Sequence, residues 1–426
     1  MESKKINKTI LCYDNGLFFE FALKLTDYFE KVLYFCPWKN SFPRMAEAVI
    51  GTEWVNGERL DTFDGKNIQR IDHIFDHIDE IDLACFLDVY DGDLQVFMED
   101  YGIPVFGSRK GEELELERWQ TKQDFKKLGM DVQPVVRIVG LEKLKEYLKD
   151  KENKYIKISK YRKEFETFKH YNAKLSEPIF DKLYDTLGPM KSITEFIVED
   201  EIDAVVEEGI DAYTIDGEFP KKLIAGVEIK DCGYFCEFMD YEDLSKGNKR
   251  VNEQMKPLLQ KYGYKGFISS EIRTTKDGKN YAIDPCCRLG SPPSELYQEL
   301  YSNLGDIIDL GSQGRMVDPE SKGKFGLEVI IHSFWYIESH QAVYFPEKYR
   351  DNIKLRYPLK IDGTYYCLNL FGLPEIGAIV VHGDSFEECK KQMLEIADTI
   401  EGHGIDIKLD SIDQAFEEFN KMKKLK

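Results

Sequence analysis

Two carboxylates on neighbouring strands are the residues whose types and spacing most directly suggest chemistry. The stretch 265–290 has the pattern of two short strands joined at Asp277-Gly278, and this dipeptide predicts a two-residue type I′ hairpin. Counting outward from the turn places Glu271 opposite Asp284, where the Cβ atoms of facing residues lie about 4.5–5.5 Å apart. Like charges so placed destabilise a sheet. We therefore expect a divalent cation between them, although a surface hairpin with two solvated acids fits equally well.

A nearby arginine supports the same interpretation. Arg288 follows Asp284 by four residues and would hold an anion beside the metal. Mg²⁺ is often bound by one or two carboxylates together with substrate phosphates. The stretch therefore suggests phosphate chemistry, which the rest of the chain has to support.

Composition limits the class of protein. The chain has 426 residues, of which 42% are hydrophobic, and this length predicts two to four globular domains. A net charge of −20 argues against a nucleic-acid or anionic-membrane partner, since both attract basic surfaces. There is no apolar run of membrane-spanning length and no secretory signal pattern. The nine cysteines lack paired zinc spacing, which favours reduced thiols and a cytoplasmic location.

The first hundred residues alternate strands with helices. This alternation predicts a doubly wound parallel sheet. The first strand is not followed by Gly-x-Gly-x-x-Gly, so a dinucleotide site is not supported. The expected strands are 8–13, 31–35, 81–87 and 103–107, with helices at 17–29 and 94–101.

The later segments change in character. A charged helical region spans 111–129, and shorter strands and helices follow it up to about residue 305. Beyond Lys324 the pattern is mixed again. The expected later strands are 132–139, 155–159, 194–199, 205–217, 327–333, 342–345 and 378–383, and the expected helices are 141–148, 252–262, 294–305 and 386–400.

Several segments in order resemble the ATP-grasp enzymes, and the glycinamide ribonucleotide synthetase (phosphoribosylamine–glycine ligase) family in particular. They are Gly102-Ile-Pro-Val-Phe-Gly107, the lysine strand at Lys157, the acidic strand at Glu199, the hairpin that ends in Asp284 and Arg288, and the block 378–410. The resemblance covers nearly the whole chain.

The resemblance implies an architecture of three parts, α/β and α+β in class. A doubly wound domain would span 1–110. An ATP-grasp domain of two α+β lobes would span 111–320, with its smaller lobe at about 130–200, and a small mixed domain would span 321–426. ATP would lie between the two lobes. The implied activity is ATP-dependent ligation of a small-molecule carboxylate to an amine through an acyl phosphate, with Mg²⁺ or Mn²⁺ as metal.

The family's ATP-contacting residues carry over to four positions. Arg118, eleven residues before Gly129, would approach the phosphates, unless it is a solvated helix arginine. Lys157 would contact phosphate, unless alternation points it to solvent. Glu199 begins the linker whose backbone would recognise adenine. Glu208, nine residues before Gly217, would bind the ribose hydroxyls. Glu207 is nearly interchangeable with it, and an exposed acid pair is the alternative.

The metal and substrate residues follow from the same resemblance. Glu271 and Asp284 match the two metal-binding carboxylates, and Arg288 matches the catalytic arginine that contacts the acyl-phosphate region. Cys286 stands where the family has asparagine, and thiols are poor Mg²⁺ ligands. One metal ligand would then be lost or replaced by water.

Two further departures concern phosphate and substrate. The family's glycine-rich loop is replaced by a segment with Lys160, Arg162, Lys163 and Lys169. These side chains would hold phosphate in place of backbone N–H groups, or the loop is simply solvated. The segment 288–293 also lacks the family's acidic residues, so glycine and phosphoribosylamine are not implied as substrates. An ATP-binding protein without catalysis is the main alternative, and a kinase-like enzyme without amine transfer is another. Neither the substrates nor the oligomeric state follow from the sequence.

Overall fold

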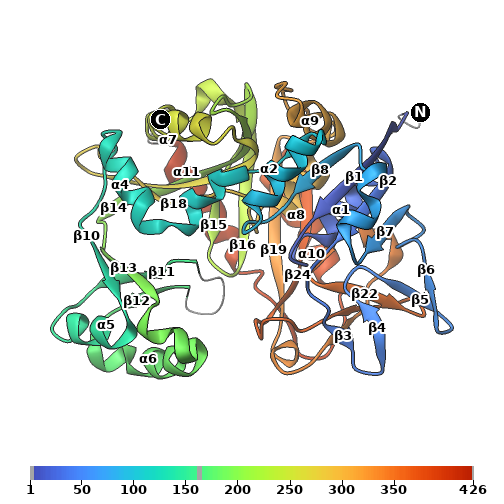
Figure 1. The fold of residues 1–426 in the computed structure, drawn as a ribbon, viewed down its shortest axis with the longest axis horizontal. Coiled ribbons are helices and arrows are strands. Elements are labelled where there is room, and N and C mark those ends of the chain that lie inside the picture. Colours follow the sequence, from blue (N-terminus) through green and yellow to red (C-terminus); the bar gives the residue numbers. More distant parts are fainter. Residues whose placement is uncertain (1–3, 161–165, 425–426) are drawn as a thin grey trace.

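The computed structural model describes residues 4–160 and 166–424. Figure 1 shows three regions side by side: a small lobe at the lower left, a long central sheet, and an N-terminal α/β unit at the right. None of the helices in the described ranges has the length and apolar character needed to cross a membrane. All nine cysteines are free thiols, and seven are buried.

A five-stranded parallel sheet forms the N-terminal unit. Its strand order is β7-β2-β1-β8-β9, so the chain first winds toward β7 and then reverses to β8 and β9. The last four residues of β1 are buried, as expected for a parallel strand covered on both faces. This order confirms the predicted doubly wound sheet. The elements are β1 (Ile6–Tyr13), α1 (Phe19–Leu25), β2 (Phe29–Phe35), β7 (Ile68–Ile71), β8 (Leu83–Phe86), α2 (Gly92–Tyr101) and β9 (Val105–Phe106).

The small lobe is an antiparallel sheet covered by two helices. Its order is β10-β13-β11-β12, and its own core includes Leu144, Ile156, Phe180 and Phe196. The Asn172 side chain accepts a hydrogen bond from the Leu175 N–H and so caps the longer helix. The elements are β10 (Val135–Val139), α5 (Leu141–Leu148), β11 (Lys154–Ile158), β12 (Thr167–His170), α6 (Ala173–Leu187) and β13 (Glu195–Asp200).

The central sheet is the largest element of the fold. Its path is β18-β17-β14-β15-β16-β19-β24-β21, and β25 pairs with β19. Because β16 pairs with β19, the sheet runs through the predicted boundary at residue 320; the three domain ranges stay predictions. The strands are β14 (Ala204–Ile215), β15 (Lys222–Ile229), β16 (Gly233–Asp240), β17 (Lys265–Thr275), β18 (Asn280–Cys286), β19 (Phe325–Ser333), β21 (Ile353–Leu355), β24 (Glu375–Gly383) and β25 (Ile405–Ile407).

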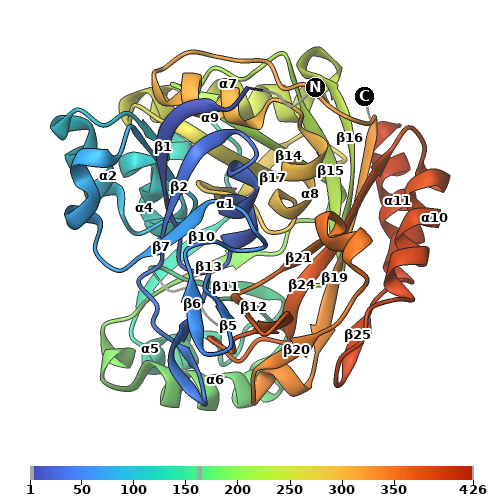
Figure 2. The ribbon, with the colours of Figure 1, turned by 90° about the vertical axis from the view of Figure 1, so that its right-hand side faces the viewer.

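Helices pack around this sheet. Figure 2 shows α10 and α11 on one side of β19 and β24 and α8 on the other. The helices are α3 (Glu113–Leu116), α4 (Arg118–Lys127), α7 (Lys246–Lys261), α8 (Ser294–Leu300), α9 (Leu304–Ser312), α10 (Phe386–Ala397) and α11 (Ser411–Lys423). The 3-10 turns are η1 (Ile74–Glu80), η2 (Arg109–Glu112), η3 (Gly188–Ser192), η4 (Tyr241–Asp243), η5 (Trp335–Ile337) and η6 (Glu347–Asn352).

A further sheet joins the two ends of the chain. Its order is β20-β23-β22-β5-β6, and β5 from the N-terminal part pairs in parallel with β22 from the C-terminal part. This pairing fixes the loops near both segments in one place. The strands are β5 (Glu53–Val55), β6 (Glu58–Leu60), β20 (Gln341–Val343), β22 (Pro358–Ile361) and β23 (Thr364–Cys367), and β3 (Ser41–Phe42) pairs separately with β4 (Met45–Val49).

The hairpin of β17 and β18 differs from its predicted form. The predicted two-residue turn is wrong: the Thr275 N–H donates to the Lys279 carbonyl at 3.0 Å, which leaves a three-residue loop with Gly278 at φ +79°. The register is therefore displaced by one residue near the turn. A β-bulge between Ser270 and Ile272 reverses this displacement. Glu271 consequently lies opposite both Ile283 and Asp284, so the two acids are neighbours after all.

Candidate active site

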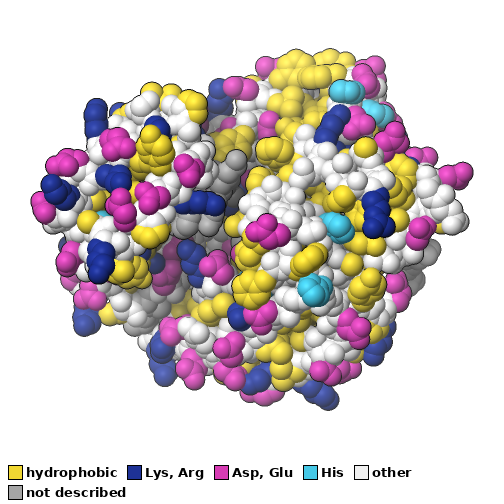
Figure 3. All heavy atoms as spheres, turned by 90° about the horizontal axis from the view of Figure 1, so that it is seen from below, with side chains coloured by type: hydrophobic (Ala, Val, Ile, Leu, Met, Phe, Trp, Pro, Cys, Tyr) yellow, Lys and Arg dark blue, Asp and Glu magenta, His cyan; other side chains and the backbone are white. Residues whose placement is uncertain are grey.

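A cleft lies where the small lobe meets the hairpin strands of the central sheet. The surface is hollowed between the small lobe and the rest of the molecule (Figure 3). Two contacts join its sides. The Tyr155 ring on β11 lies 5.6 Å from the Arg273 guanidinium on β17, and the Lys157 Nζ lies 3.0 Å from the Asp284 Oδ2 on β18.

Lys157 points into this cleft. Its side chain is only 4% exposed, and its Nζ lies 3.4 Å from Glu199 and donates to the Ile283 carbonyl at 3.1 Å. Burial by itself would lower the pKa of Lys157, but the attraction of Asp284 and Glu199 outweighs burial and raises the pKa. The alternative that Lys157 points to solvent is therefore wrong.

A second lysine, which we did not predict from the sequence, also pairs with Glu199. The Lys122 Nζ on α4 lies 3.1 Å from the buried Glu199 and donates to the carbonyls of Ala282 and Ile283. Ile283 lies in the bulge between β17 and β18, and its carbonyl accepts from both Lys122 and Lys157. Lys122 follows Arg118 by one helical turn, so residue spacing was the signal that could have found it.

Arg118 contributes the third positive charge of the cleft. It is buried, forms an ion pair with Glu166, and its Nη1 lies 3.4 Å from Asp284. It is therefore not a solvated helix arginine. Burial favours the neutral form of Asp284, but Lys157 and Arg118 outweigh this and hold the pKa of Asp284 far below its usual range.

The acids on β14 and β17 separate by face. Glu207 pairs with Arg273 and Gly209 with Glu271 in the register, so Glu207 and Glu271 share the cleft face. Burial and the neighbouring Glu207 raise the pKa of Glu271 well above its usual value. Glu208 is buried on the opposite face, where Ser245 Oγ donates to its carboxylate at 2.6 Å. Glu208 is therefore not brought together with the other predicted ATP residues.

The carboxylates of this face suit a divalent cation by their chemistry. Among the described residues, no group of three or more histidine, cysteine or acidic side chains is arranged to hold a metal. A magnesium site needs only one or two protein carboxylates when phosphates supply the other oxygens. Glu271 and Asp284 provide two, and a cation would relieve the crowding that raises the pKa of Glu271. Mg²⁺ or Mn²⁺ thus fits these donors. In this structure Asp284 forms ion pairs with Lys157 and Arg118.

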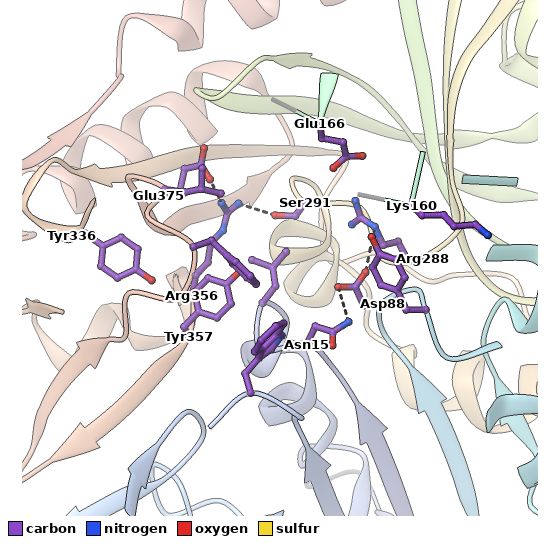
Figure 4. A pocket seen from close by; sticks show the side chains of 15 residues that line it. Asn15, Asp88, Lys160, Glu166, Arg288, Ser291, Tyr336, Arg356, Tyr357 and Glu375 are labelled. Atoms are coloured by element: carbon purple, nitrogen blue, oxygen red, sulfur yellow. Dashed lines mark hydrogen bonds and ion pairs between the residues drawn. The ribbon is translucent and has the colours of Figure 1, made fainter. Parts of the chain in front are cut away.

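A cavity of about 480 Å³ opens beside the cleft. Glu166, which pairs with Arg118, lines it, and so does Arg288. The Arg288 Nε lies 3.1 Å from Glu115 and 3.5 Å from Asp88. Figure 4 shows Arg288 and Asp88 on one side of the cavity and Arg356, Glu375 and Tyr336 on the other, with Ser291 between them.

The basic loop after β11 is described only in part. Lys160 is exposed, pairs with Glu117 and lines the same cavity. Lys169 forms a 2.6 Å ion pair with Glu201. Arg162 and Lys163 lie outside the described residues. The two described lysines are thus held by carboxylates, and their role in phosphate binding stays a prediction.

Comparison with known proteins identifies the fold. No family model matches the sequence, and no curated protein matches it. Solved structures do match. Phosphoribosylamine–glycine ligase from Thermotoga maritima is 15% identical, with a TM-score of 0.68 over 93% of this chain and 98% of that chain. The biotin carboxylase domain of 2-oxoglutarate carboxylase from Hydrogenobacter thermophilus, determined with MgADP, ADP and bicarbonate, is 12% identical, with a TM-score of 0.65 over 99% of each chain.

A third structure agrees with these two. N5-carboxyaminoimidazole ribonucleotide synthetase from Thermotoga maritima is 14% identical, with a TM-score of 0.58 over 94% of this chain and 100% of that chain. The chain therefore has the ATP-grasp fold. The expected resemblance to phosphoribosylamine–glycine ligase is confirmed at the level of the fold.

Proposed function

We propose that the protein is an ATP-dependent ligase that joins a carboxylate to an amine through an acyl phosphate. One observation carries the proposal: the cleft and the cavity meet at Glu166, which pairs with Arg118 and lines the cavity. A phosphate group held in the cleft would thus lie next to a substrate held in the cavity. The structural neighbours named above include two synthetic enzymes and one carboxylase domain determined with nucleotide.

The chain's own residues divide the work of nucleotide binding. Lys157 and Arg118 would exchange their contacts with Asp284 for contacts with phosphate oxygens, because both carry buried positive charge. Glu207 has the better position for the ribose hydroxyls, since Glu208 faces away from the cleft. Glu199, which holds Lys157 and Lys122 in place, lies at the start of the segment predicted to recognise adenine.

Glu271 and Asp284 would hold Mg²⁺ or Mn²⁺, which would neutralise phosphate charge when bound. The carboxylate oxygen of one substrate attacks the terminal phosphorus, and ADP leaves. The amine nitrogen then attacks the acyl carbon, the C–O bond to phosphate breaks with its electron pair, and one proton is released. Arg288 lies at the cavity wall, where it would orient the acyl phosphate. The protein thus acts mainly by positioning and charge compensation.

The test is ADP release with Mg·ATP and a panel of amino acids, other carboxylates and amines. We expect at least one pair to stimulate release and to yield an amide. The proposal fails if no pair does so, and if Glu271→Gln leaves the background rate unchanged. The free thiols favour a reducing compartment, so the panel should contain compounds of the cytoplasm.

A nucleotide-binding protein without ligase activity is the second candidate. The pairing of Asp284 with Lys157 and Arg118 favours it, because a metal ligand neutralised by two bases is poorly prepared for a cation. Cys286, two residues further along β18, adds no hard oxygen donor. This candidate predicts that calorimetry detects ADP binding while no panel member stimulates turnover.

A further inference from the structure

The cavity lies where an open α/β sheet characteristically binds ligands. Asn15 follows β1, Trp38 follows β2, and Asp88 follows β8. The strand order reverses between β1 and β8, and ligands of such sheets bind outside the carboxyl ends of strands at this switch point. The Asn15 side chain donates to Asp88 at 3.4 Å across it. The position of the cavity therefore follows from the strand order of the N-terminal sheet.

One wall of the cavity is aromatic. The Phe371 ring lies 5.7 Å from Trp38 and 5.9 Å from Tyr357 between ring centres, in edge-to-face arrangements. Tyr336 is buried beside them, and its hydroxyl donates to the Leu368 carbonyl at 2.5 Å. These four rings come from four different loops or turns, yet they line one space. A flat or extended apolar group would pack against this wall.

The described lining residues of the cavity include three acids and three bases, and further carboxylates lie behind the bases. Each of the three bases among its described lining residues already has carboxylate partners. Arg288 has Asp88 and Glu115, Arg356 has Glu295 and Glu375, and Lys160 has Glu117. The two arginines thus face four carboxylates. A free anion would have to compete with these partners, whereas a cation would meet surplus negative charge.

We propose that this cavity selects the amine substrate, and that this substrate carries an aromatic or extended apolar group. The inference rests on the proposed ligase function and names its acceptor class. The ammonium group would face Glu375 or Asp88 and lose its proton before attack, while the apolar group would pack against Phe371 and Tyr357. A cavity of about 480 Å³ falls within the size range of sites for drug-sized ligands. A two-carbon amine would leave most of its aromatic wall unused.

Binding of simple probes tests charge and shape separately. Tryptamine, its neutral analogue indole-3-ethanol, its acidic counterpart indole-3-acetate, and ethylamine would be titrated calorimetrically into the full chain. We expect tryptamine to bind about tenfold more tightly than indole-3-ethanol, since a desolvated cation gains from both acids and aromatic rings. Indole-3-acetate and ethylamine should bind most weakly. Tighter binding of indole-3-acetate overturns the assignment of charge, and equal binding of ethylamine overturns the role of the aromatic wall.

Two variants with matched controls locate the site. Phe371→Ala should weaken tryptamine about tenfold, whereas Phe97→Ala, an exposed ring packed against Phe75 at 5.8 Å and Tyr101 at 6.3 Å in the α/β unit, should not. Glu375→Gln should weaken tryptamine but not indole-3-ethanol, whereas Glu242→Gln, at a side chain 90% exposed, should change neither. Asp88→Asn repeats the charge test from the opposite wall if Glu375→Gln does not fold. Unchanged tryptamine binding in all three cavity variants overturns the proposal.

The outcome separates this inference from the ligase proposal. Tryptamine binding needs no turnover, so the amine site can be present in a chain that releases no ADP. Turnover stimulated only by small or acidic acceptors would support the ligase and overturn the amine class. If tryptamine binds but no pair of substrates stimulates ADP release, the proposed amine site is supported and the proposed ligase function is refuted.

Discussion

The paired acids of the cleft and the buried Asp14 beside the cavity hold their carboxylates in opposite ways. In the cleft, Asp284 and Glu199 are paired with lysines and an arginine, and their pKa values are lowered. At the carboxyl end of β1, beside the cavity, burial raises the pKa of Asp14 to about 7, and its buried Oδ1 has no hydrogen-bond partner in the described structure. Asp284 and Glu199 are thus compensated by neighbouring bases, whereas Asp14, which lies behind the arginine-paired acids of the cavity, is a buried acid that favours the protonated state.

The difference also concerns the backbone. The cleft residues sit on strands and on one helix, where alternation and helical spacing fix the direction of each side chain. Most of the cavity residues sit on loops, which come from the N-terminal part, the middle and the C-terminal part of the chain. We therefore expect substitutions in the cleft to have large effects on nucleotide binding and stability. Substitutions around the cavity should have smaller effects that are specific to the acceptor.

Lys157→Met should have the largest effect. It removes a buried charge from between Glu199 and Asp284 and should weaken ADP binding about a hundredfold. It should also lower the free energy of unfolding by about 3 kcal/mol, because it leaves buried carboxylates less compensated. Calorimetric titration with ADP and urea denaturation measure the two effects.

The control is a lysine on the same strand. Lys154 forms a 2.5 Å ion pair with Asp200, but both side chains are more exposed. Lys154→Met should change the stability by less than about 1 kcal/mol and leave ADP binding as it is. Equal effects of the two variants would contradict the proposal that Lys157 contacts the nucleotide.

Glu271→Gln should reduce ADP release about a hundredfold, since it removes one of two proposed metal ligands. The folded-state pKa of Glu271 is raised by burial and by Glu207. The stability that Glu271 contributes is therefore greatest below its unfolded-state pKa of about 4.3. It is lost as the pH rises through the folded-state pKa of Glu271. In the absence of metal the variant should consequently melt higher than the wild type at pH 8. A lower melting temperature there would contradict the crowding of these acids.

Much of the fold was predictable because it depends on local pattern, whereas Arg118, Lys157 and Glu199 of the cleft were named through the resemblance to a family. The doubly wound sheet follows from alternating strands and helices, and the strand containing Lys157 and the helix 141–148 lie where the periodicity placed them. Glu271 and Asp284 were placed together for a partly wrong reason. The turn contains one more residue than predicted, and a bulge compensates for it; a bulge without glycine leaves no clear sequence signal.

The remaining features depend on tertiary contacts. The burial of Glu208 against Ser245 follows from the position of α7, and alternation along β14 identifies a face only after one face has been located. The cavity joins Trp38 to Phe371 across more than three hundred residues. Neither loop has a periodic pattern, so no local rule brings them together. For this reason the sequence indicated the proposed nucleotide site but not the shape of the cavity.

Asp14→Asn tests the cavity side by its pH dependence. Burial, reinforced by the nearby Asp88 charge, raises the pKa of Asp14 to about 7. The stability that Asp14 contributes is thus greatest below its unfolded-state pKa of about 3.9. It is lost as the pH rises through the folded-state pKa of about 7. Wild-type stability should fall from pH 5.5 to pH 8, and the variant should show a smaller fall. Urea denaturation at three pH values measures it, and an unchanged slope would contradict the burial of this charge.

Asn40→Ala should have the smallest effect and the most local one. The Asn40 side chain donates at 2.7 Å to the Asn369 carbonyl and so ties the loop of Trp38 to the loop of Phe371. The bond is exposed, so its loss should cost only about 1 kcal/mol. Because both rings belong to the aromatic wall, tryptamine should bind a few times more weakly while ADP binding stays the same. Equal weakening of both ligands would show that cleft and cavity move as one unit, which would contradict the distinction between them.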